Sequence, residues 1–298
     1  MHYKKAKSLL TKWNSMNIYR GCTHGCIYCD SRSKCYNFNH KFEDIEVKIN
    51  APLLLESILK SKRKKCMIST GSMSDPYMPI EKNLKLTRKC LELIDKYGFG
   101  ATVITKSDLI LRDLDLLKSI NEKSKCVVQM TLTTFDEELC KKIEPNVITT
   151  KKRFEVLKIL NENNIPTIVW LTPILPFIND TKENIDGILN YCIEAKVKGI
   201  IIFDIGMTLR EGNREYYYDM LDKYFPNLRN IYEKKYRSNY NVLSETSKNL
   251  MKYIKDKCRE NNIMCNPYEC FDYINEFPNK FEQLSIDTIY RWNKSVLS

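Results

Sequence analysis

Three of the twelve cysteines of this chain lie within eight residues of one another, at Cys22, Cys26 and Cys29. Glycines stand at positions 21 and 25 of the same loop. Three thiolates on a short, glycine-containing loop can converge on one soft metal centre, either a zinc ion or an iron–sulfur cluster. The spacing therefore predicts a metal site.

The residues alone leave the identity of the metal open. Zinc would recruit a fourth protein ligand, for which His24 and Cys35 are the nearby candidates. A cube of four irons would instead leave one iron without a protein ligand. A disulfide is disfavoured, because nothing marks the chain as secreted and a trio leaves one cysteine unpaired.

The string from Tyr19 to Asp30, Tyr-Arg-Gly-Cys-Thr-His-Gly-Cys-Ile-Tyr-Cys-Asp, resembles the signature of the radical S-adenosylmethionine superfamily. Its details resemble the branch that includes spore photoproduct lyase. The resemblance implies that the three cysteines hold a [4Fe-4S] cluster, whose fourth iron is chelated by the amino and carboxylate groups of S-adenosylmethionine. Tyr28, which precedes the third cysteine, is expected to contact this cofactor.

A Gly-Ser-Met-Ser-Asp turn follows the second predicted strand and offers hydroxyls at Ser72 and Ser74 and a carboxylate at Asp75. The same residue types form ordinary turns, so a purely structural role is the alternative. The turn resembles the segment with which the branch binds the amino group of S-adenosylmethionine. By that resemblance, all three residues are expected to bind the cofactor.

The next strand ends in Thr-Lys106-Ser107, and a lysine in the mouth of a barrel is unusual without an anionic partner. The resemblance implies that Lys106 pairs with the methionine carboxylate. The alternative is that Ser107 caps a helix while Lys106 faces solvent.

Further polar residues follow the later strands. Gln129 and Thr131 alternate on one face of a strand, and the resemblance places Thr131 beside the ribose of S-adenosylmethionine. Gly206 follows the sixth strand and would allow close approach to a ligand. Glu144 and Arg153 match a Glu-Pro-x7-Arg string of the branch, which we interpret as architectural.

Short apolar strands alternate with amphipathic helices at intervals of about 30 residues, which predicts a parallel sheet with right-handed crossovers. The predicted strands end at Tyr19 and cover 66–70, 100–105, 126–133, 166–171 and 198–204, and the predicted helices cover 51–60, 83–97, 109–120, 151–161 and 181–194. Six units are too few for a closed eight-stranded barrel. They agree with the partial (β/α)6 TIM-like barrel of α/β class that the resemblance implies, and the active site is then expected at the carboxyl ends of the strands.

We expect this barrel to occupy residues 1–205 and a mainly helical extension to occupy 206–298. Seven of the eighteen tyrosines lie between Tyr216 and Tyr240. They would suit a cover over the open side of the barrel, or would stack on nucleic-acid bases. Three further cysteines, at 258, 265 and 270, raise the question of a second cluster, although their spacing matches none that we know.

Composition is that of a globular protein, with 43% hydrophobic and 29% charged residues. The net charge of +11 suits a nucleic-acid partner, but lysine outnumbers arginine by 36 to 12, so a general compositional bias explains it equally well. No signal-like or membrane-spanning apolar run is present. We therefore expect a cytoplasmic protein without a membrane partner, in which thiols stay free for metals.

These observations favour a radical S-adenosylmethionine enzyme. Such an enzyme uses an electron donor such as flavodoxin or ferredoxin to cleave the cofactor reductively to a 5'-deoxyadenosyl radical, which takes hydrogen from a substrate, here undetermined. DNA repair of the spore photoproduct lyase type is one alternative. However, the branch's hydrogen-donating cysteine is replaced by Ser72, whose O–H bond is too strong for that step. A non-catalytic zinc or iron–sulfur protein is the other alternative.

Overall fold

The computed structural model describes residues 1–278 and is built on a six-stranded sheet with the order β2-β5-β6-β7-β8-β9. Every neighbouring pair in this sheet is parallel. The strands are β2 (Ser15–Met16), β5 (Met67–Thr70), β6 (Gly100–Thr105), β7 (Cys126–Thr131), β8 (Thr167–Trp170) and β9 (Gly199–Ile201). Because β2 and β9 do not pair, the sheet is an open, partial barrel of the predicted kind.

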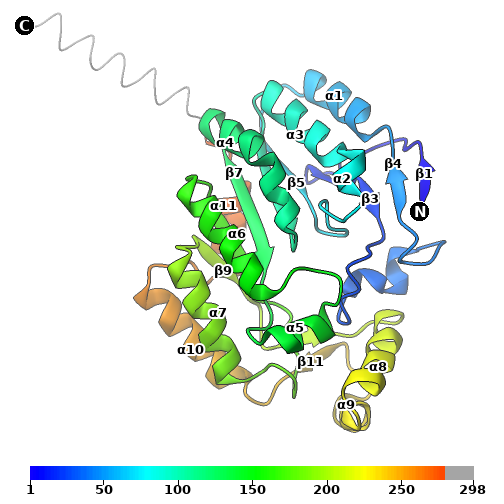
Figure 1. The fold of residues 1–298 in the computed structure, drawn as a ribbon, viewed down its shortest axis with the longest axis vertical. Helices are drawn as coiled ribbons and strands as arrows, with labels where there is room; N and C mark the ends of the chain where they lie inside the picture. The colour runs from blue at the N-terminus through cyan, green and yellow to red at the C-terminus, as the bar shows by residue number, and fades with distance from the viewer. Residues whose placement is uncertain (279–298) are drawn as a thin grey trace, which may run out of the picture.

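Helices follow one another along the outer side of the sheet, as Figure 1 shows for α1, α3, α4, α6 and α7. These and the shorter helices of this part are α1 (Ala51–Ser61), α2 (Glu81–Leu84), α3 (Leu86–Lys96), η3 (Asp108–Asp113), α4 (Leu114–Lys123), α5 (Glu137–Ile143), α6 (Thr150–Glu162) and α7 (Lys182–Glu194). Their apolar faces and the strands form the main core, with residues such as Val103, Val128 and Leu157 fully buried. The sheet is therefore covered by helices, as parallel sheets require.

One predicted strand was wrong in detail. The first barrel strand is β2, whereas Tyr19 belongs to β3 (Tyr19–Arg20) in a separate three-stranded sheet with the order β1-β4-β3. The other two strands of that sheet are β1 (His2–Lys4) and β4 (Glu46–Lys48). Strands of two or three residues are too short to show an alternating pattern, so no sequence pattern marks them separately.

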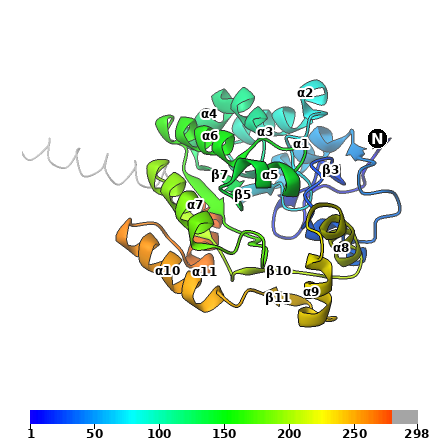
Figure 2. The same cartoon turned by 60° about the horizontal axis from the view of Figure 1, so that its bottom comes forward.

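After the barrel, the chain forms helices and one small antiparallel sheet. Its elements are β10 (Gly206–Thr208), α8 (Asn213–Tyr224), α9 (Leu228–Tyr236), β11 (Asn241–Leu243), α10 (Ser247–Glu260) and α11 (Pro267–Asn275). Figure 2 shows α8 and α9 on the side of the N-terminal segment and α10 beside α7. The predicted extension runs to residue 298, and its last 20 residues, 279–298, lie outside the described part of the chain.

Two short 3-10 helices, η1 (Asp30–Arg32) and η2 (Lys34–Tyr36), follow the cysteine loop. Across residues 1–278, the search for a helix with the length and apolar character of a membrane span found none.

Candidate active site

The cysteine loop begins where β3 ends and is held there by the backbone. The amide of Cys22 donates a hydrogen bond to the carbonyl oxygen of Phe42 at 3.1 Å. Gly21 has a φ of +91°, and a Cβ atom at this position would lie 2.4 Å from the same oxygen. Glycine is therefore needed here, because a side chain would push the first cysteine out of place.

The other side of the loop is held by residues 143–146, between α5 and α6. The amide of Ile27 donates to the carbonyl of Ile143 at 3.0 Å, and the amide of Asn146 donates to the carbonyl of His24 at 3.1 Å. The Asn146 side chain also donates to the carbonyl of Thr23 at 2.9 Å. These hydrogen bonds from residues 143–146, which we call the clamp, were not predicted from the sequence. The Glu-Pro string noted above lies in the same segment.

A cavity of about 100 Å³ joins the cysteine loop to the carboxyl ends of β5, β6 and β7. Nine of the eleven residues predicted for the metal and cofactor line it. They are Cys22, Cys26, Tyr28, Cys29, Ser72, Ser74, Asp75, Lys106 and Thr131. The fold thus brings together thiols and strand-end polar groups that are up to 109 positions apart in the sequence (131 − 22).

Asp75 is the most heavily hydrogen-bonded residue of the cavity wall. Its carboxylate accepts hydrogen bonds from the Thr105 hydroxyl at 2.8 Å, the Lys106 amide at 2.7 Å and the Tyr77 amide at 2.8 Å. His24 Nδ1 lies 3.5 Å from the same carboxylate. Asp75 therefore joins the β5 turn to the end of β6 and fixes the backbone of Lys106.

The two serines of the β5 turn differ. The Ser74 hydroxyl is buried and donates to the carbonyl of Tyr19 at 2.9 Å, which ties the turn to β3. Ser72 is exposed at the cavity surface, and so its hydroxyl is open to a ligand.

Lys106 carries its charge into the cavity beside Cys26. Within residues 1–278, its Nζ atom has no hydrogen-bond or ion-pair partner and lies 5.9 Å from the centre of the Tyr28 ring. Burial works to lower the pKa of Lys106, but the Cys26 sulfur when it is a thiolate, together with the carboxylates of Glu144 and Asp75, favours the charged ammonium, and the pKa is raised. The ammonium is therefore a charged donor without an anionic ligand of its own.

Behind the cavity wall, a buried chain of polar contacts links the cysteine loop to β7. The Tyr28 hydroxyl donates to Glu144, which forms an ion pair with Arg153. Arg153 also donates to the carbonyl of Thr131 at 2.7 Å. Glu144 and Arg153 are fully buried, and the pKa of Glu144 is lowered because the charges of Arg153 and Lys106 outweigh burial. The two residues that we interpreted as architectural therefore form a buried ion pair.

The thiols of Cys22 and Cys26 are held in their neutral form by their surroundings. Burial and the negative charge of Asp75 raise the pKa of Cys22 to about 12. Burial also raises the pKa of Cys26, although the positive charge of Lys106 acts in the opposite direction. A metal that binds these thiols therefore has to displace their protons.

Two predicted cofactor residues lie outside the cavity. The Gln129 side chain is buried within the barrel, where it donates to Thr102 at 2.7 Å and accepts from the Trp170 indole at 2.8 Å. Gly206 pairs with β11, and a Cβ atom at this position would lie 2.3 Å from the carbonyl oxygen of Val242. The close approach that Gly206 permits is therefore to another strand.

The spacing of the three sulfur atoms bears on the choice between zinc and a cluster. Tetrahedral zinc with Zn–S bonds of about 2.3 Å keeps its sulfur ligands roughly 3.8 Å apart. Among the residues that the structure describes, the cysteine trio is not a group whose ligand atoms all lie within 4.8 Å of one another. The three sulfur atoms are therefore not arranged as a compact single-ion site, and the unpartnered Lys106 suits a carboxylate-bearing ligand beside the loop.

In the other cysteine trio, the thiols of Cys258 and Cys265 form a hydrogen bond with each other, while Cys270 packs in a different core. Cys258 belongs to the main core, whereas Cys270 packs in a separate core with Ile168 and Ile201. Its Sγ atom lies 3.8 Å from the carbonyl oxygen of Ile200. This division favours structural thiols over a second cluster.

Comparison with known proteins places the chain in a family. The family model described as the radical SAM superfamily matches residues 16–192, which is more than half of the chain. The chain belongs to the radical SAM superfamily. It is therefore an enzyme of the radical SAM class, and membership implies an iron–sulfur cluster and S-adenosylmethionine as its cofactors.

Its relatives in sequence include uncharacterized proteins. One from Methanocaldococcus jannaschii is 40% identical over 56% of this chain and 62% of its own length. One from Mycobacterium tuberculosis is 26% identical over 75% of this chain and 67% of its own length. The chain thus matches about two thirds or less of the length of these relatives.

Among solved structures, spore photoproduct lyase complexed with a dinucleoside spore photoproduct superposes with a TM-score of 0.62 at 13% identity. The match covers 88% of this chain and 80% of that one. This likeness confirms the predicted partial barrel and concerns the fold alone.

Proposed function

We propose that the cavity is the active site, where Cys22, Cys26 and Cys29 hold a [4Fe-4S] cluster and the strand ends hold S-adenosylmethionine. The observation that carries the proposal is the meeting of the three thiols with the unpartnered ammonium of Lys106 in one cavity. A zinc ion would bind the thiols, but it would supply no anionic partner for the ammonium of Lys106. When bound, the two cofactors supply the one-electron cleavage and hydrogen abstraction typical of the superfamily.

Some residues of the cavity would contact the cofactor directly, and others would position those that do. Lys106 would pair with its carboxylate, and Ser72 and Thr131 would offer hydroxyl groups. Asp75 would act through the backbone, since it fixes both the β5 turn and Lys106. Tyr28 would position the cysteine loop through its hydrogen bond to Glu144.

The substrate remains undetermined in this proposal, and DNA repair of the spore photoproduct lyase type is the second candidate. It is favoured by an adjoining cavity of about 380 Å³, lined by lysines at 82, 106, 141 and 152 and by one carboxylate, Asp108. Such a lining suits phosphate groups. Against it, the wall of the cysteine cavity has Ser72 where the branch has its hydrogen-donating cysteine.

Replacement of one cysteine tests the cluster. We expect Cys26→Ala, purified and reconstituted without oxygen, to lose its iron and the release of 5'-deoxyadenosine after chemical reduction. Cys35→Ala is the matched control, because Cys35 is exposed and lies outside the cavity wall. Retention of iron and of 5'-deoxyadenosine release in Cys26→Ala would falsify the assignment, as would a parent protein that holds zinc and no iron at these cysteines.

A further inference from the structure

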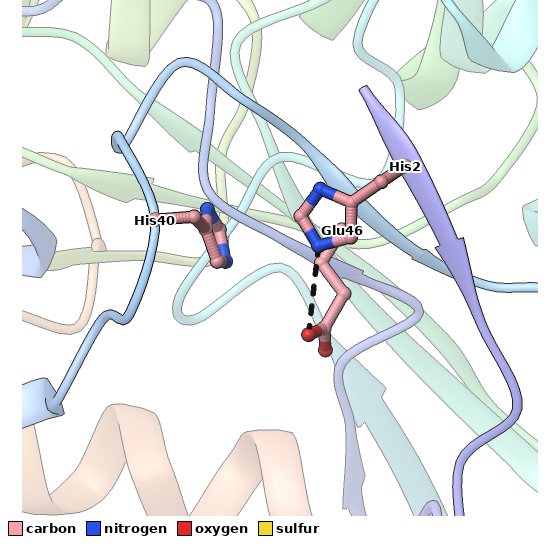
Figure 3. A group of neighbouring side chains, drawn as sticks. All are labelled: His2, His40 and Glu46. Carbon is pink, nitrogen blue, oxygen red and sulfur yellow. Dashed lines mark ion pairs between the residues drawn. The ribbon is translucent and has the colours of Figure 1, made fainter.

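A second group of metal-type ligands lies in the small N-terminal sheet, outside the cysteine cavity. His2 and Glu46 are register partners on the parallel strands β1 and β4, and His40 lies in the loop before β4. One ligand atom from each of the three residues lies within 4.8 Å of the other two. Figure 3 shows the two imidazole rings and the carboxylate facing a common space.

When the two imidazoles are neutral, their second contacts decide which ring nitrogen carries the proton. His40 Nδ1 lies 2.9 Å from the backbone carbonyl oxygen of Lys41, which can only accept a hydrogen bond. His2 Nδ1 lies 2.9 Å from the carboxylate of Asp44, which is likewise an acceptor. The proton of each neutral ring therefore stands on Nδ1, and Nε2 presents a lone pair.

These lone pairs lack donors. His40 Nε2 is buried and has no hydrogen-bond partner within the described residues. His2 Nε2 lies 3.9 Å from the Oε2 atom of Glu46 and forms an ion pair with it when the ring is protonated, whereas a neutral ring leaves two acceptors facing each other. Glu46 is only 3% exposed, and the pKa of its carboxyl group is lowered because Lys4 and Arg20 outweigh the effect of burial. A positive charge between the three groups would satisfy all of them.

We propose that His2, His40 and Glu46 form a divalent-metal site, most suited to zinc, that is separate from the cysteine loop. Two imidazoles and a carboxylate are a common zinc ligand set, with a fourth position left to water. Small side-chain rotations would bring the ligand atoms to the spacing of about 3.3 Å set by bonds of about 2.0–2.1 Å. Metal-bound histidines ordinarily donate their other N–H to a carboxylate or a carbonyl, as Asp44 and Lys41 allow here.

The position of the site would let a bound metal stabilise the segment next to the cysteine loop. Glu46 is the register partner of Arg20 on β3, the strand that leads into the cysteine loop. The loop between His40 and Glu46 contains Phe42, whose carbonyl accepts the amide hydrogen of Cys22. A metal at this site would tie the N-terminal strand to the loop that holds the first cysteine.

One feature of the site competes with a metal. Lys4 Nζ lies 2.9 Å from the Oε2 atom of Glu46 and already supplies one positive charge to that carboxylate. Removal of this ammonium should therefore strengthen metal binding. A cluster held together only by hydrogen bonds would not gain zinc affinity in this way.

The test is zinc binding by protein that carries no polyhistidine tag and has been stripped with a chelator. In a variant with Cys22, Cys26 and Cys29 all changed to Ala, we expect one zinc ion per chain by equilibrium dialysis. A further His40→Ala change should weaken zinc binding by at least about a hundredfold. Lys4→Gln should tighten it, and Asn39→Ala, at an exposed neighbouring position, should leave it unchanged.

X-ray absorption of the intact chain, with its cysteines occupied by a reconstituted cluster, tests the site without any substitution. The expected zinc environment has nitrogen and oxygen ligands only, and zinc should raise the unfolding temperature. Sulfur at about 2.3 Å from zinc would overturn the proposal. So would the absence of bound zinc, or zinc affinity that His40→Ala leaves intact. These results do not depend on the release of 5'-deoxyadenosine, so this proposal can fail without the proposed enzymatic function.

Discussion

Lys106 is the residue of the cavity whose surroundings in the structure most clearly call for a ligand. Its neighbours Asp75 and Ser74 have partners inside the protein, whereas its ammonium has none within residues 1–278. The neighbouring Cys26 thiol would become a thiolate on metal binding and would hold the lysine in its charged form. The lysine and the cluster would therefore support each other, and an anionic group between them would complete the arrangement.

We expect Lys106→Met to weaken the binding of S-adenosylmethionine by about tenfold to a hundredfold, the loss typical of a charge-assisted hydrogen bond. The measurement is titration calorimetry on reconstituted, unreduced protein. Lys82→Met is the control, because Lys82 lines only the adjoining cavity. Equal affinities in the two variants would show that Lys106 does not bind the cofactor.

At the scale of elements, the cysteine loop is built by parts of the chain that are remote in sequence. Residues 143–146 bind its backbone, and the Tyr28–Glu144–Arg153 chain of contacts joins it to β7. An ion pair as deeply buried as Glu144 and Arg153 is costly to break, because the partner left behind stays charged and desolvated.

Glu144→Gln should therefore lower the free energy of unfolding of the metal-free protein by about 3–5 kcal/mol, as measured in denaturant. Glu138→Gln, on the same α5 but in an exposed pair with Lys141, should leave the midpoint unchanged. The pKa of Glu144 is lowered by folding, so its contribution is complete above the ordinary carboxyl pKa of about 4.3 and is lost as the pH falls further. A Glu144→Gln protein as stable as the parent at neutral pH would contradict this account.

The sequence predicted those elements whose pattern is long enough to read. The β/α alternation marked α6 and α7 and the strands β5 to β9 within a few residues, because each carries several turns or a continuous apolar run. The strands β1 and β4 were missed and Tyr19 of β3 was assigned to the barrel, since two or three residues show no period. Lys106 and the cysteines were predictable from their types and strand-end positions, but the internal partners of Gln129 and Gly206 depend on packing that no local pattern reveals.

On the scale of the whole molecule, the part after the barrel packs against the cysteine loop. The tyrosines Tyr217, Tyr218, Tyr232 and Tyr236 form one buried core with Cys26, Ile27 and Tyr28 of the cysteine loop. Tyr232 is fully buried and donates to the carbonyl of Pro176 at 2.7 Å. These four tyrosines therefore pack against the loop, and their burial leaves them unavailable to stack on bases.

We expect Tyr232→Ala to lower the free energy of unfolding by about 3–5 kcal/mol, as removal of a buried aromatic ring ordinarily does. It should also lower the iron content after reconstitution, because the ring supports the cysteine loop. Tyr268→Ala is the control, since this tyrosine is 80% exposed. Unchanged stability and iron content in Tyr232→Ala would mean that this packing is not needed by the loop.

The clamp on the cysteine loop also sets an order of events during synthesis. The three thiols are made early, yet Glu144 follows Tyr28 by 116 positions, and the four tyrosines packed against the loop come later still. At about 5–20 residues per second, roughly 10–40 s pass on the ribosome between the first cysteine and Tyr232. During that interval the thiols meet whatever metals and oxidants the cell contains. If the cysteines hold the proposed cluster, its delivery would therefore follow the synthesis of residues up to Tyr232.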